Sequence, residues 1–390
     1  MTPPPQVHAR GLEVGFGSAV ITPPMPVVLA GFGARKGLVS EVHDDLEVHA
    51  VFLRNGGQSL CLLVLDLLML GPEVAGPLRV KVAVALGLDH SSVLTSCTHT
   101  HSGPAATLHT KRIGWPMPEE YAELLVGQCV IAGIAAQNSA EPVALGYARG
   151  RLPVDLSLNR RGLPYDPQLS LVEVRRPDGT LAGTLANVGI HPVALGIDCR
   201  AISGDWPTVT RGELRGSSAA PAVVIQGASG DVNPTRDPHT NPTPGGNWDT
   251  ASELGRSVAE VIDGLRASAG SVRGEQLVPF VRHEQVRAGL TVPALLAGRA
   301  LRRVDVELVE WRLGDISLVA LPGEAFHALG RDIERARGDR VLLAGLAPSW
   351  LGYLPQPWGK GYEEKMSYGR GFTSAVARAL LSPPPDDAGA

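Results

Sequence analysis

The sequence has no paired cysteines, no long apolar run and no basic patch, and each absence excludes a class of protein. No Cys-x-x-Cys pair or disulfide-framework spacing is present, and Cys61, Cys97 and Cys129 lie in apolar segments where we expect buried thiols. Even the apolar run Leu60–Leu70 is interrupted by Asp66 and is too short for a membrane span. A net charge of −4 without clustered lysine or arginine argues against a nucleic-acid partner.

Aromatic residues are also scarce, at 5%, whereas apolar residues make up 44% of the chain, so aliphatic side chains must build a large core. The 46 glycines and 32 prolines exceed ordinary usage and indicate many loops between short elements. The N-terminal residues Met1–Pro5 contain no apolar stretch of the kind found in a signal peptide. We therefore expect a cytoplasmic protein.

Apolar runs alternate along the chain with segments of helical periodicity, and no repeat is visible. The expected strands are Leu12–Ile21, Glu47–Arg54, Ser59–Leu67, Ser92–Cys97, Leu169–Arg175, Leu181–Gly189, Ala222–Gln226, Val304–Arg312, Ile316–Leu321 and Val341–Leu346. The expected helices are Leu78–Leu86, Pro118–Asn138, Thr250–Ser268 (with Thr250 and Glu253 as a capping box), Glu324–Arg337 and Phe372–Leu381. This pattern predicts an α/β fold of layered mixed sheets covered by helices. We expect one domain over residues 12–381, between an N-terminal tail at 1–11 and a disordered tail at 382–390.

Two histidines follow one of the expected strands. The stretch Thr98-His99-Thr100-His101-Ser102-Gly103-Pro104 comes directly after Ser92–Cys97, and α/β proteins place their chemistry at strand ends. In an extended backbone, residues i and i+2 point to the same face, so both imidazoles are expected to reach one site. Neutral imidazole is the commonest metal ligand and the usual general base near neutral pH. The alternative is a polar turn with two exposed histidines.

Four further polar residues are candidates for a site. His191 follows the run Leu181–Gly189, with a structural histidine as the alternative. Asp205 lies in a turn, where it would either orient a ligand histidine or cap a helix. Glu324 is expected in the first turn of a helix, where the helix dipole favours a carboxylate and a metal ligand is also plausible. His327, one helical turn further on, is the weaker candidate.

Small and polar residues mark three other segments. Gly227–Pro234 follows an expected strand, and its small residues would let the backbone approach a ligand or form an anion-binding nest. It contains Ser229 but lacks the Gly-x-Ser-x-Gly pattern of a nucleophile elbow. Asp237–Asn247 is expected to be a long surface loop over a site. Tyr353 follows Val341–Leu346, where it would either cap the core or face the site.

A single metal site is the arrangement that unites these positions. His99, His101, His191, Glu324 and Tyr353 each lie at or just beyond the end of an expected strand. Nitrogen and oxygen ligands without thiolate favour zinc, with another divalent ion as the alternative. The sequence therefore predicts a zinc site at the strand ends.

Eight short motifs also occur in a characteristic order. They are Ile21-Thr22-Pro23-Pro24, His43-Asp44-Asp45, residues 98–104, Asn159-Arg160, His191-Pro192, Gly230-Asp231-Val232-Asn233-Pro234, Pro322-Gly323-Glu324 and Gly352-Tyr353. In this order the chain resembles the neutral/alkaline, non-lysosomal ceramidase family over most of its length. The motif His-Thr-His-Ser-Gly-Pro, which begins at His99, is the most specific part of the likeness.

The resemblance implies an enzyme that hydrolyses an N-acyl amide with one zinc ion and a metal-activated water. By matching motif, the zinc ligands would be His99, His191, Glu324 and Tyr353. His101 would stand beside the metal and assist proton transfer or orient the carbonyl. Arg160 matches a family arginine near the substrate and would stabilise the developing oxyanion.

Two features depart from the family pattern. Family members commonly have Gly-Asp-Val-Ser-Pro-Asn where this chain has Asn233 in place of the serine, and an amide side chain cannot be an acyl-accepting nucleophile. Only 37 residues follow Tyr353, so we expect the C-terminal immunoglobulin-like domain of longer ceramidases to be missing.

The sequence therefore predicts a zinc-dependent hydrolase that cleaves an amide or ester bond of a small-molecule or lipid-like substrate. Few aromatics and no evident basic amphipathic helix lead us to expect a substrate smaller than a long-chain ceramide. Two alternatives stay open. One is a metal-independent serine hydrolase that uses Ser229. The other is a non-catalytic, metal-stabilised binding protein in which Asn233 marks lost catalysis.

Overall fold

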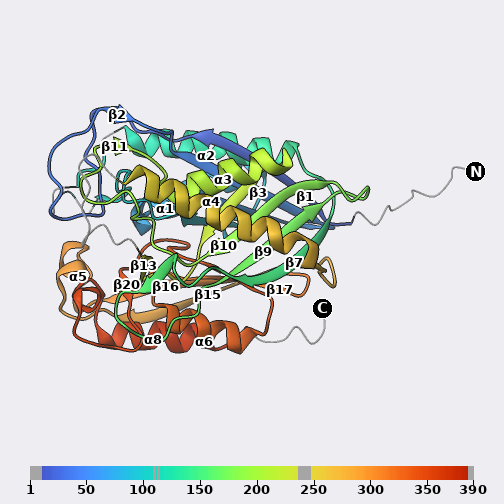
Figure 1. Cartoon of the computed structure of the whole chain (residues 1–390). Coiled ribbons are helices and arrows are strands. Elements are labelled where there is room, and N and C mark those ends of the chain that lie inside the picture. Colours follow the sequence, from blue (N-terminus) through green and yellow to red (C-terminus); the bar gives the residue numbers. More distant parts are fainter. Residues whose placement is uncertain (1–10, 109–110, 112–114, 119, 236–246, 385–390) are drawn as a thin grey trace, which may run out of the picture.

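Three mixed β-sheets surround a shared apolar core, and helices cover their other faces, in the computed structural model of the chain (Figure 1). The structure describes residues 11–108, 111, 115–118, 120–235 and 247–384. The predicted layered α/β class is confirmed. No helix in these described ranges has the length and apolar character needed to cross a membrane. Nearly all of the expected tails and of the expected loop Asp237–Asn247 lies outside the described residues, and the single domain over 12–381 stays a prediction.

The first sheet contains β1 (Glu13–Val20), β3 (Glu47–Asn55), β4 (Gln58–Leu65), β5 (Val93–Cys97) and β6 (Glu141–Pro142). It packs against α1 (Pro72–Leu86) and α2 (Tyr121–Asn138). The strand order is β5-β4-β3-β1-β6, with only β4 and β5 parallel. β3 and β4 are buried along most of their length because one face meets the helices and the other meets the central core. This double burial explains their almost continuous apolar sequences.

The second and third sheets repeat this plan. The second sheet contains β7 (Ala144–Arg151), β9 (Gln168–Arg175), β10 (Leu181–Val188), β12 (Ala222–Gln226) and β14 (Gly270–Ser271), with helices α3 (Trp206–Ser218) and α4 (Trp248–Leu265). The third contains β15 (Leu277–Arg287), β16 (Arg303–Leu313), β17 (Ile316–Ala320) and β19 (Val341–Ala344), with helices α6 (His327–Arg337) and α8 (Arg370–Leu381). In these sheets only the pairs β10–β12 and β17–β19 are parallel.

Short elements join the layers. Three two-stranded sheets pair β2 (Glu41–Val42) with β11 (Ala201–Ile202), β8 (Ser157–Asn159) with β13 (Val232–Pro234), and β18 (Glu324–Ala325) with β20 (Tyr353–Leu354). Short helices are α5 (Val292–Leu296), α7 (Tyr362–Lys365), and the 3-10 turns η1 (His90–Ser92) and η3 (Arg266–Ser268).

Each large sheet therefore has at its edge a parallel pair of strands joined through a helix: β4–α1–β5, β10–α3–β12 and β17–α6–β19. The three edge strands β5, β12 and β19 meet in the centre. The Ser96 hydroxyl donates to the Gly345 carbonyl (2.8 Å), and the Gly345 amide donates to the Gln226 carbonyl (2.7 Å). The central core contains residues from all three sheets, including Val51, Val172 and Trp311, and its burial from water holds the sheets together.

All ten expected strands are strands in the structure. The differences concern the bounds of helices, and helices and strands that were not expected. α3 was not expected because its buried stripe includes Thr210 and Arg211, which hide the apolar periodicity. The proposed capping box at Thr250 is wrong, because α4 begins at Trp248 and its N-cap is Asn247. The helix expected from Glu324 begins only at His327. β7 and β15 were also not expected.

Asp66, which interrupts the apolar run 60–70, is fully buried behind the site. Its carboxylate accepts two hydrogen bonds from Arg211 on α3 (3.0 and 2.5 Å) and one from the Thr98 hydroxyl (3.1 Å). Burial raises the pKa of Asp66, and the Arg211 guanidinium offsets part of that rise. The pair thus links the first sheet to α3 and contacts Thr98, the residue before His99.

Replacing Arg211 by methionine is expected to lower the free energy of unfolding by about 3–5 kcal/mol, because Asp66 would remain buried without a cation. Urea denaturation of the two proteins measures the difference. Arg215→Met, an exposed change on the same helix, should shift stability by less than about 0.5 kcal/mol. Adding Asp66→Leu to Arg211→Met should recover most of the loss. An Arg211→Met protein as stable as the wild type would contradict this role.

Candidate functional site

The carboxyl ends of the parallel strands bring the predicted site residues together. His99 follows β5, His191 follows β10, Glu324 follows β17, and Tyr353 follows β19. Residues at the carboxyl ends of parallel strands share one edge of a sheet. Because the three parallel edges meet in the centre of the molecule, residues far apart in sequence reach one place.

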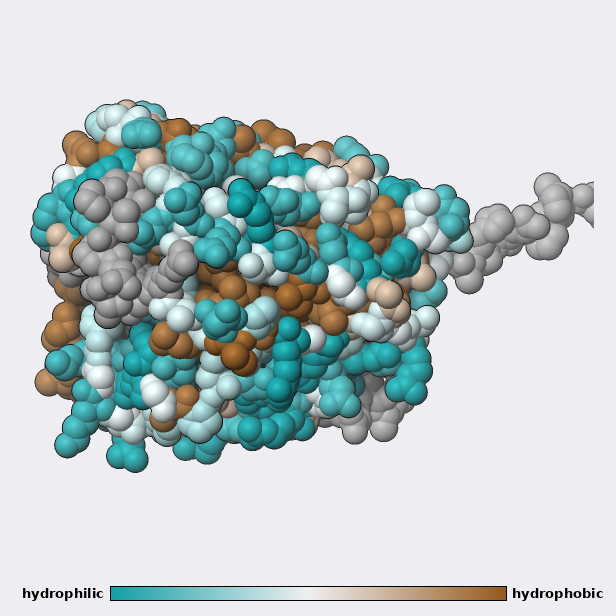
Figure 2. Space-filling view, in the orientation of Figure 1, coloured by the Kyte–Doolittle hydropathy of each residue, from teal (hydrophilic) through white to brown (hydrophobic). Residues whose placement is uncertain are grey.

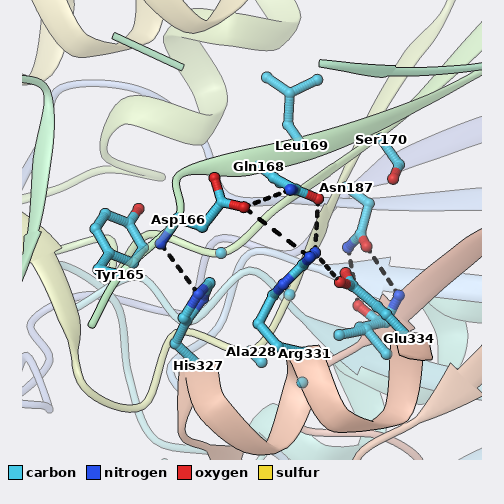
Figure 3. A pocket seen from close by; sticks show the side chains of 14 residues that line it. Tyr165, Asp166, Gln168, Leu169, Ser170, Asn187, Ala228, His327, Arg331 and Glu334 are labelled. Carbon is cyan, nitrogen blue, oxygen red and sulfur yellow. Dashed lines mark hydrogen bonds and ion pairs between the residues drawn. The ribbon is translucent and has the colours of Figure 1, made fainter. Parts of the chain in front are cut away.

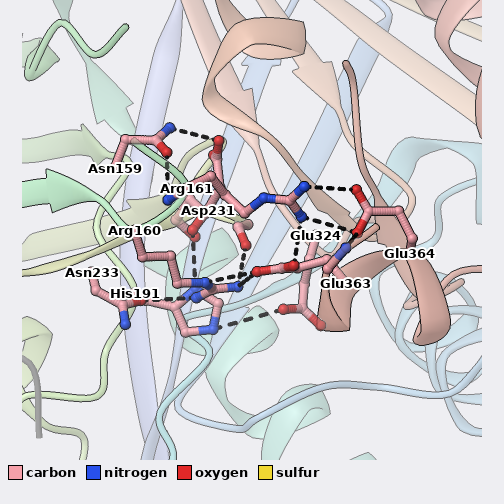
Figure 4. A network of polar contacts seen from close by, with 12 residues as sticks. Asn159, Arg160, Arg161, His191, Asp231, Asn233, Glu324, Glu363 and Glu364 are labelled. Carbon is pink, nitrogen blue, oxygen red and sulfur yellow. Dashed lines mark hydrogen bonds and ion pairs between the residues drawn. The ribbon is translucent and has the colours of Figure 1, made fainter. Parts of the chain in front are cut away.

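His99, His191 and Glu324 converge most closely. The Nε2 atoms of His99 and His191 lie 3.0 Å apart, and Glu324 Oε2 lies 3.1 Å from His99 Nε2 and 3.7 Å from His191 Nε2. All three side chains are almost completely buried. Figure 4 shows His191 facing the Glu324 carboxylate across this gap. The ring nitrogens of His99, His101 and His191 also lie within 4.8 Å of one another, a cluster that can hold a metal ion.

The hydrogen bonds of Nδ1 in His99 and in His191 determine which form of each ring faces the gap beside Glu324. His99 Nδ1 lies 2.6 Å from the Leu68 carbonyl, and His191 Nδ1 lies 3.0 Å from the Ser229 carbonyl. A carbonyl oxygen only accepts, so each Nδ1 carries the hydrogen, and in the neutral ring Nε2 is a bare lone pair. Burial and the neighbouring His99 lower the pKa of His191 well below its usual value, so its ring is neutral. Two such lone pairs and a carboxylate oxygen would repel one another, so this gap requires a cation, either a proton on a ring nitrogen, as in a His99–Glu324 ion pair, or a metal ion.

The backbone at His99 is not extended, which corrects the expectation that both imidazoles project from an extended strand. β5 ends at Cys97, and His99 has φ of 72°, in the left-handed region that non-glycine residues rarely occupy. The His99 amide donates to the Leu67 carbonyl (2.9 Å), which holds this conformation in place. The rings of His99 and His101 still lie close, with centroids 5.1 Å apart. Both imidazoles therefore reach one place, although an extended backbone is not the reason. Strained backbone of this kind concentrates at functional sites.

Glu324 lies on the short strand β18 and not in the first turn of a helix, so the helix dipole does not explain it. Trp350 Nε1 donates to its other oxygen, Oε1 (2.8 Å), which orients the carboxylate toward His99. Burial by itself would raise the pKa of Glu324, but the charge and hydrogen bond of His99 outweigh it and hold the pKa at about 2. The carboxylate is therefore ionised at neutral pH.

Tyr353 is the strand partner of Glu324. The two residues are paired in the parallel register of β18 and β20, which places both side chains on the same side. The Tyr353 hydroxyl interacts with Glu324 and with Arg160. Burial, and then the Glu324 charge, raise the pKa of Tyr353 well above its usual value. The side chain thus lies at the site as a neutral phenol.

His101 is held beside this group by a close fit. Its ring lies edge-on to Phe32, with centroids 4.9 Å apart, and its carbonyl accepts a hydrogen bond from the Arg35 guanidinium. Gly31 has φ of 99°, and a Cβ atom there would lie 2.3 Å from His101 Nδ1, so only glycine fits. His101 lines a cavity of about 590 Å³ together with His191 and Tyr353.

Arg160 joins the site to a buried polar network (Figure 4). Its guanidinium donates to Glu363 Oε1 (2.9 Å), to Asn233 Oδ1 (2.9 Å) and to the Gly230 carbonyl (2.6 Å). The neighbouring Arg161 pairs with Glu363 and Glu364. Most of the donors of Arg160 are therefore already used, which favours a positioning role over direct contact with an oxyanion.

Asn233 takes its orientation from this network. Because a guanidinium only donates, the atom bonded to Arg160 is the amide oxygen, and the amide nitrogen faces the other way. Asn233 lines the same cavity as His101. Asn233 thus brings to the cavity wall an amide whose oxygen is held by Arg160 and whose other polar group is a hydrogen-bond donor.

The structure decides two points that the sequence left open in this region. Of the two alternatives for Asp205, the helix cap is the one observed. Its carboxylate accepts from the Trp206 amide (2.7 Å) as the N-cap of α3, and from the Leu195 amide (3.1 Å). In the segment Gly227–Pro234, the amides of Gly227, Gly230 and Val232 donate to backbone carbonyls (2.9, 2.8 and 2.9 Å), so these three N–H groups are not available to bind an anion. A Cβ at Gly230 would lie 2.6 Å from the Glu324 carbonyl, so the small residue serves backbone packing.

Ser229 contributes to the site through its backbone. Its carbonyl contacts His191 Nδ1 (3.0 Å), whereas its hydroxyl oxygen accepts from Gln226 Nε2 (2.5 Å). The amide of Gln226 is no general base, so this contact does not activate the hydroxyl. The geometry gives no support to a serine nucleophile.

His327 lies in a different cavity from the cluster of His99, His101 and His191. It lines a small cavity with Asp166, Arg331 and Glu334 (Figure 3), and its Nε2 accepts from the Asp166 amide (3.3 Å). Burial, followed by the Arg331 charge, lowers the pKa of His327 to about 4. The cavity has a volume of about 30 Å³, enough for roughly one water molecule. His327 is therefore a structural histidine.

An apolar cavity adjoins the cavity beside His101. Its volume is about 220 Å³, and Trp115, Leu296, Trp350 and Tyr362 are among the residues that line it. Tyr362 also lines the larger cavity beside His101. Trp350 and Glu363 had no recognised role in the sequence, because neither lies in a motif with a known chemical pattern. Only their contacts with Glu324 and Arg160 reveal them.

Comparisons with known proteins agree with this geometry at the level of the fold. No protein-family model matches the chain, and no curated protein matches it by sequence. Among solved structures, neutral ceramidase from Pseudomonas aeruginosa is similar with a TM-score of 0.80 and 20% identity, over 95% of this chain and 74% of that chain. A ceramidase complexed with C2 is similar with a TM-score of 0.81 and 18% identity, over the same shares. The resemblance expected from the motifs is confirmed, and the chain has the fold of neutral ceramidase.

Proposed function

We propose that the protein is a zinc-dependent amidohydrolase that cleaves an N-acyl amide, or a related ester, with water as the nucleophile. The observation that carries this proposal is the convergence of two imidazole Nε2 atoms and an ionised carboxylate in a buried pocket. The fold shared with ceramidases supports an amide substrate. The cytoplasmic location expected from the sequence stays a prediction, which fractionation of the source cells would check.

The residues fit zinc. His99, His191 and Glu324 supply two nitrogens and one oxygen without thiolate, which is a ligand set of catalytic zinc sites, and Tyr353 completes the set. The Leu68 and Ser229 carbonyls fix both rings through their outer nitrogens, as outer-shell partners do in metal sites. Zinc bound here would polarise the substrate carbonyl and lower the pKa of a water molecule beside it.

The chain's own side chains divide the remaining work. His101 faces the cavity and is placed to take the proton of the attacking water and return it to the leaving amine nitrogen as the C–N bond breaks. The Asn233 amide N–H donates toward the substrate carbonyl oxygen, where negative charge develops. Arg160 holds Asn233 and Tyr353 in place and is itself held by Glu363.

The cavities indicate the shape of the substrate. The space beside His101 has polar walls that include Arg161 and Asn233, which suit the amine half. The apolar cavity of about 220 Å³ has room for one alkyl chain of limited length. A substrate with a single acyl chain, smaller than a long-chain ceramide, fits both.

We expect kcat/KM to rise by up to about fourfold for each added methylene while the acyl chain fills the apolar cavity, since each buried methylene contributes about 0.8 kcal/mol. The efficiency should then fall for long chains. A series of N-acyl amides of increasing chain length, assayed with the zinc-loaded protein, measures this dependence. A continuous rise out to long chains would contradict the size limit.

The same assay separates the alternatives. Removal of the metal by a chelator should abolish hydrolysis and zinc should restore it, whereas a serine hydrolase that uses Ser229 would stay active. A protein that binds zinc tightly but cleaves no amide or ester in the series would be the metal-stabilised binding protein, and the proposed function would be wrong.

A further inference from the structure

The segment 287–303, which contains α5, presents an exposed apolar face at one end of the molecule. The side chains of Leu290, Val292, Leu295 and Leu301 are 69%, 62%, 53% and 52% exposed. Figure 2 shows hydrophobic side chains on the edge of the molecule where Figure 1 places α5. Pro293 and other small residues anchor the opposite side of the helix in the interior. Large apolar side chains gathered in this way mark an interaction surface.

The same segment is basic, although the protein as a whole carries a charge of −4. Four arginines and no aspartate or glutamate lie between Val286 and Val304. Three of them, Arg287, Arg302 and Arg303, are exposed. Exposed leucines flanked by arginines are the composition of segments that bind anionic lipid surfaces. No basic amphipathic helix was expected from the sequence, because α5 has only five helical residues and shows no periodicity.

This face adjoins the apolar cavity beside the site. Val292 and Leu296 of α5 line the cavity, and so does Trp350. Trp350 is the residue that donates to Glu324 Oε1 (2.8 Å). Tyr362, which is 58% exposed, lines both the apolar cavity and the larger cavity beside His101. An alkyl chain that enters from this face therefore stays in apolar surroundings up to the proposed metal site.

We propose that the face of Leu290, Val292, Leu295 and Leu301, with its flanking arginines, docks on the surface of an anionic lipid bilayer and admits the acyl chain of single-chain amphiphilic substrates, of limited chain length and partitioned into that surface, to the apolar cavity. The docking is independent of the hydrolase, whereas the entry of substrate rests on the proposed function. A second copy of the chain is a poorer occupant, because two such faces would bring arginines of like charge together.

Vesicle co-sedimentation tests the docking with the full-length protein. The wild type is expected to bind vesicles of equal parts phosphatidylcholine and phosphatidylserine, and to bind phosphatidylcholine alone more weakly. The triple change Leu290→Ser, Leu295→Ser and Leu301→Ser should weaken binding by about tenfold or more, because it removes the apolar contact. Arg302→Gln with Arg303→Gln should weaken it by a similar factor and reduce its dependence on salt.

The matched control changes two exposed apolar residues on other helices, Val84→Ser on α1 and Ile131→Ser on α2, which should leave vesicle binding unchanged. The triple variant should hydrolyse a short, water-soluble N-acyl amide at the wild-type rate. Failure of the wild type to bind vesicles would overturn the proposal, as would a dimer in solution that only the triple variant disrupts. A protein that binds vesicles through this face but hydrolyses no amide would keep the docking and lose the proposed function.

Discussion

His99→Ala is expected to lower the zinc affinity by more than about 100-fold and to abolish hydrolysis. This exceeds the roughly 10–100-fold loss caused by removing a residue that only hydrogen-bonds to a metal ligand. The physical reason is that His99 Nε2 is the closest neighbour of both His191 Nε2 (3.0 Å) and Glu324 Oε2 (3.1 Å). Without it, the two remaining groups cannot surround a cation. Zinc content after dialysis, together with competition against a chelator of known affinity, measures the change.

The matched control is His327→Ala, which removes another largely buried, neutral histidine outside the site. This variant should keep its zinc. The assignment would fail if His99→Ala retained full zinc occupancy under metal-limited conditions, or if both variants lost the metal together. In the second case general destabilisation, and not loss of a ligand, would explain the result.

His101→Ala is expected to lower turnover by roughly 10²–10⁴-fold while zinc binding persists. His101 lines the cavity, and its ring centroid lies 5.1 Å from that of His99 and 5.2 Å from that of His191, so it is placed for proton transfer beside the metal ligands. Single-turnover kinetics with the zinc-loaded variant separates this loss from a loss of substrate binding.

Ser229→Ala provides the contrasting result. It removes a hydroxyl that contacts Gln226, so turnover should stay close to that of the wild type. A covalent adduct on Ser229 during turnover, or equal losses in the two variants, would overturn the water mechanism. Retention of full activity by His101→Ala would remove that histidine from proton transfer.

The residues of the site could be predicted because they follow strands whose sequences are almost continuously apolar. β4, β5 and β12 are buried on both faces, so each apolar run and its polar end are visible locally. His99, His191 and Glu324 each follow such a strand, and the order of their motifs also predicted the ceramidase fold. Asp205 was left open between two interpretations, and only the position of α3 decided for the N-cap.

Other features were invisible because they depend on contacts between distant segments. The left-handed backbone at His99, the hydrogen bond from Trp350 to Glu324 and the pairing of Asp66 with Arg211 join residues that share no local pattern. The same holds for Arg160, whose donors the structure shows to be used by Glu363 and Asn233. Side-chain direction at these positions follows from packing and not from spacing.

The sequence by itself determined ten of the strands, their polar ends and the chemical types of the candidate ligands, because periodicity and turn chemistry act over a few residues. Only the tertiary structure decided that three sheets bring their parallel edges together, and therefore that Nε2 of His99, Nε2 of His191 and the Glu324 carboxylate meet. That meeting depends on burial of a core shared by all three sheets, a free energy that no local segment contains.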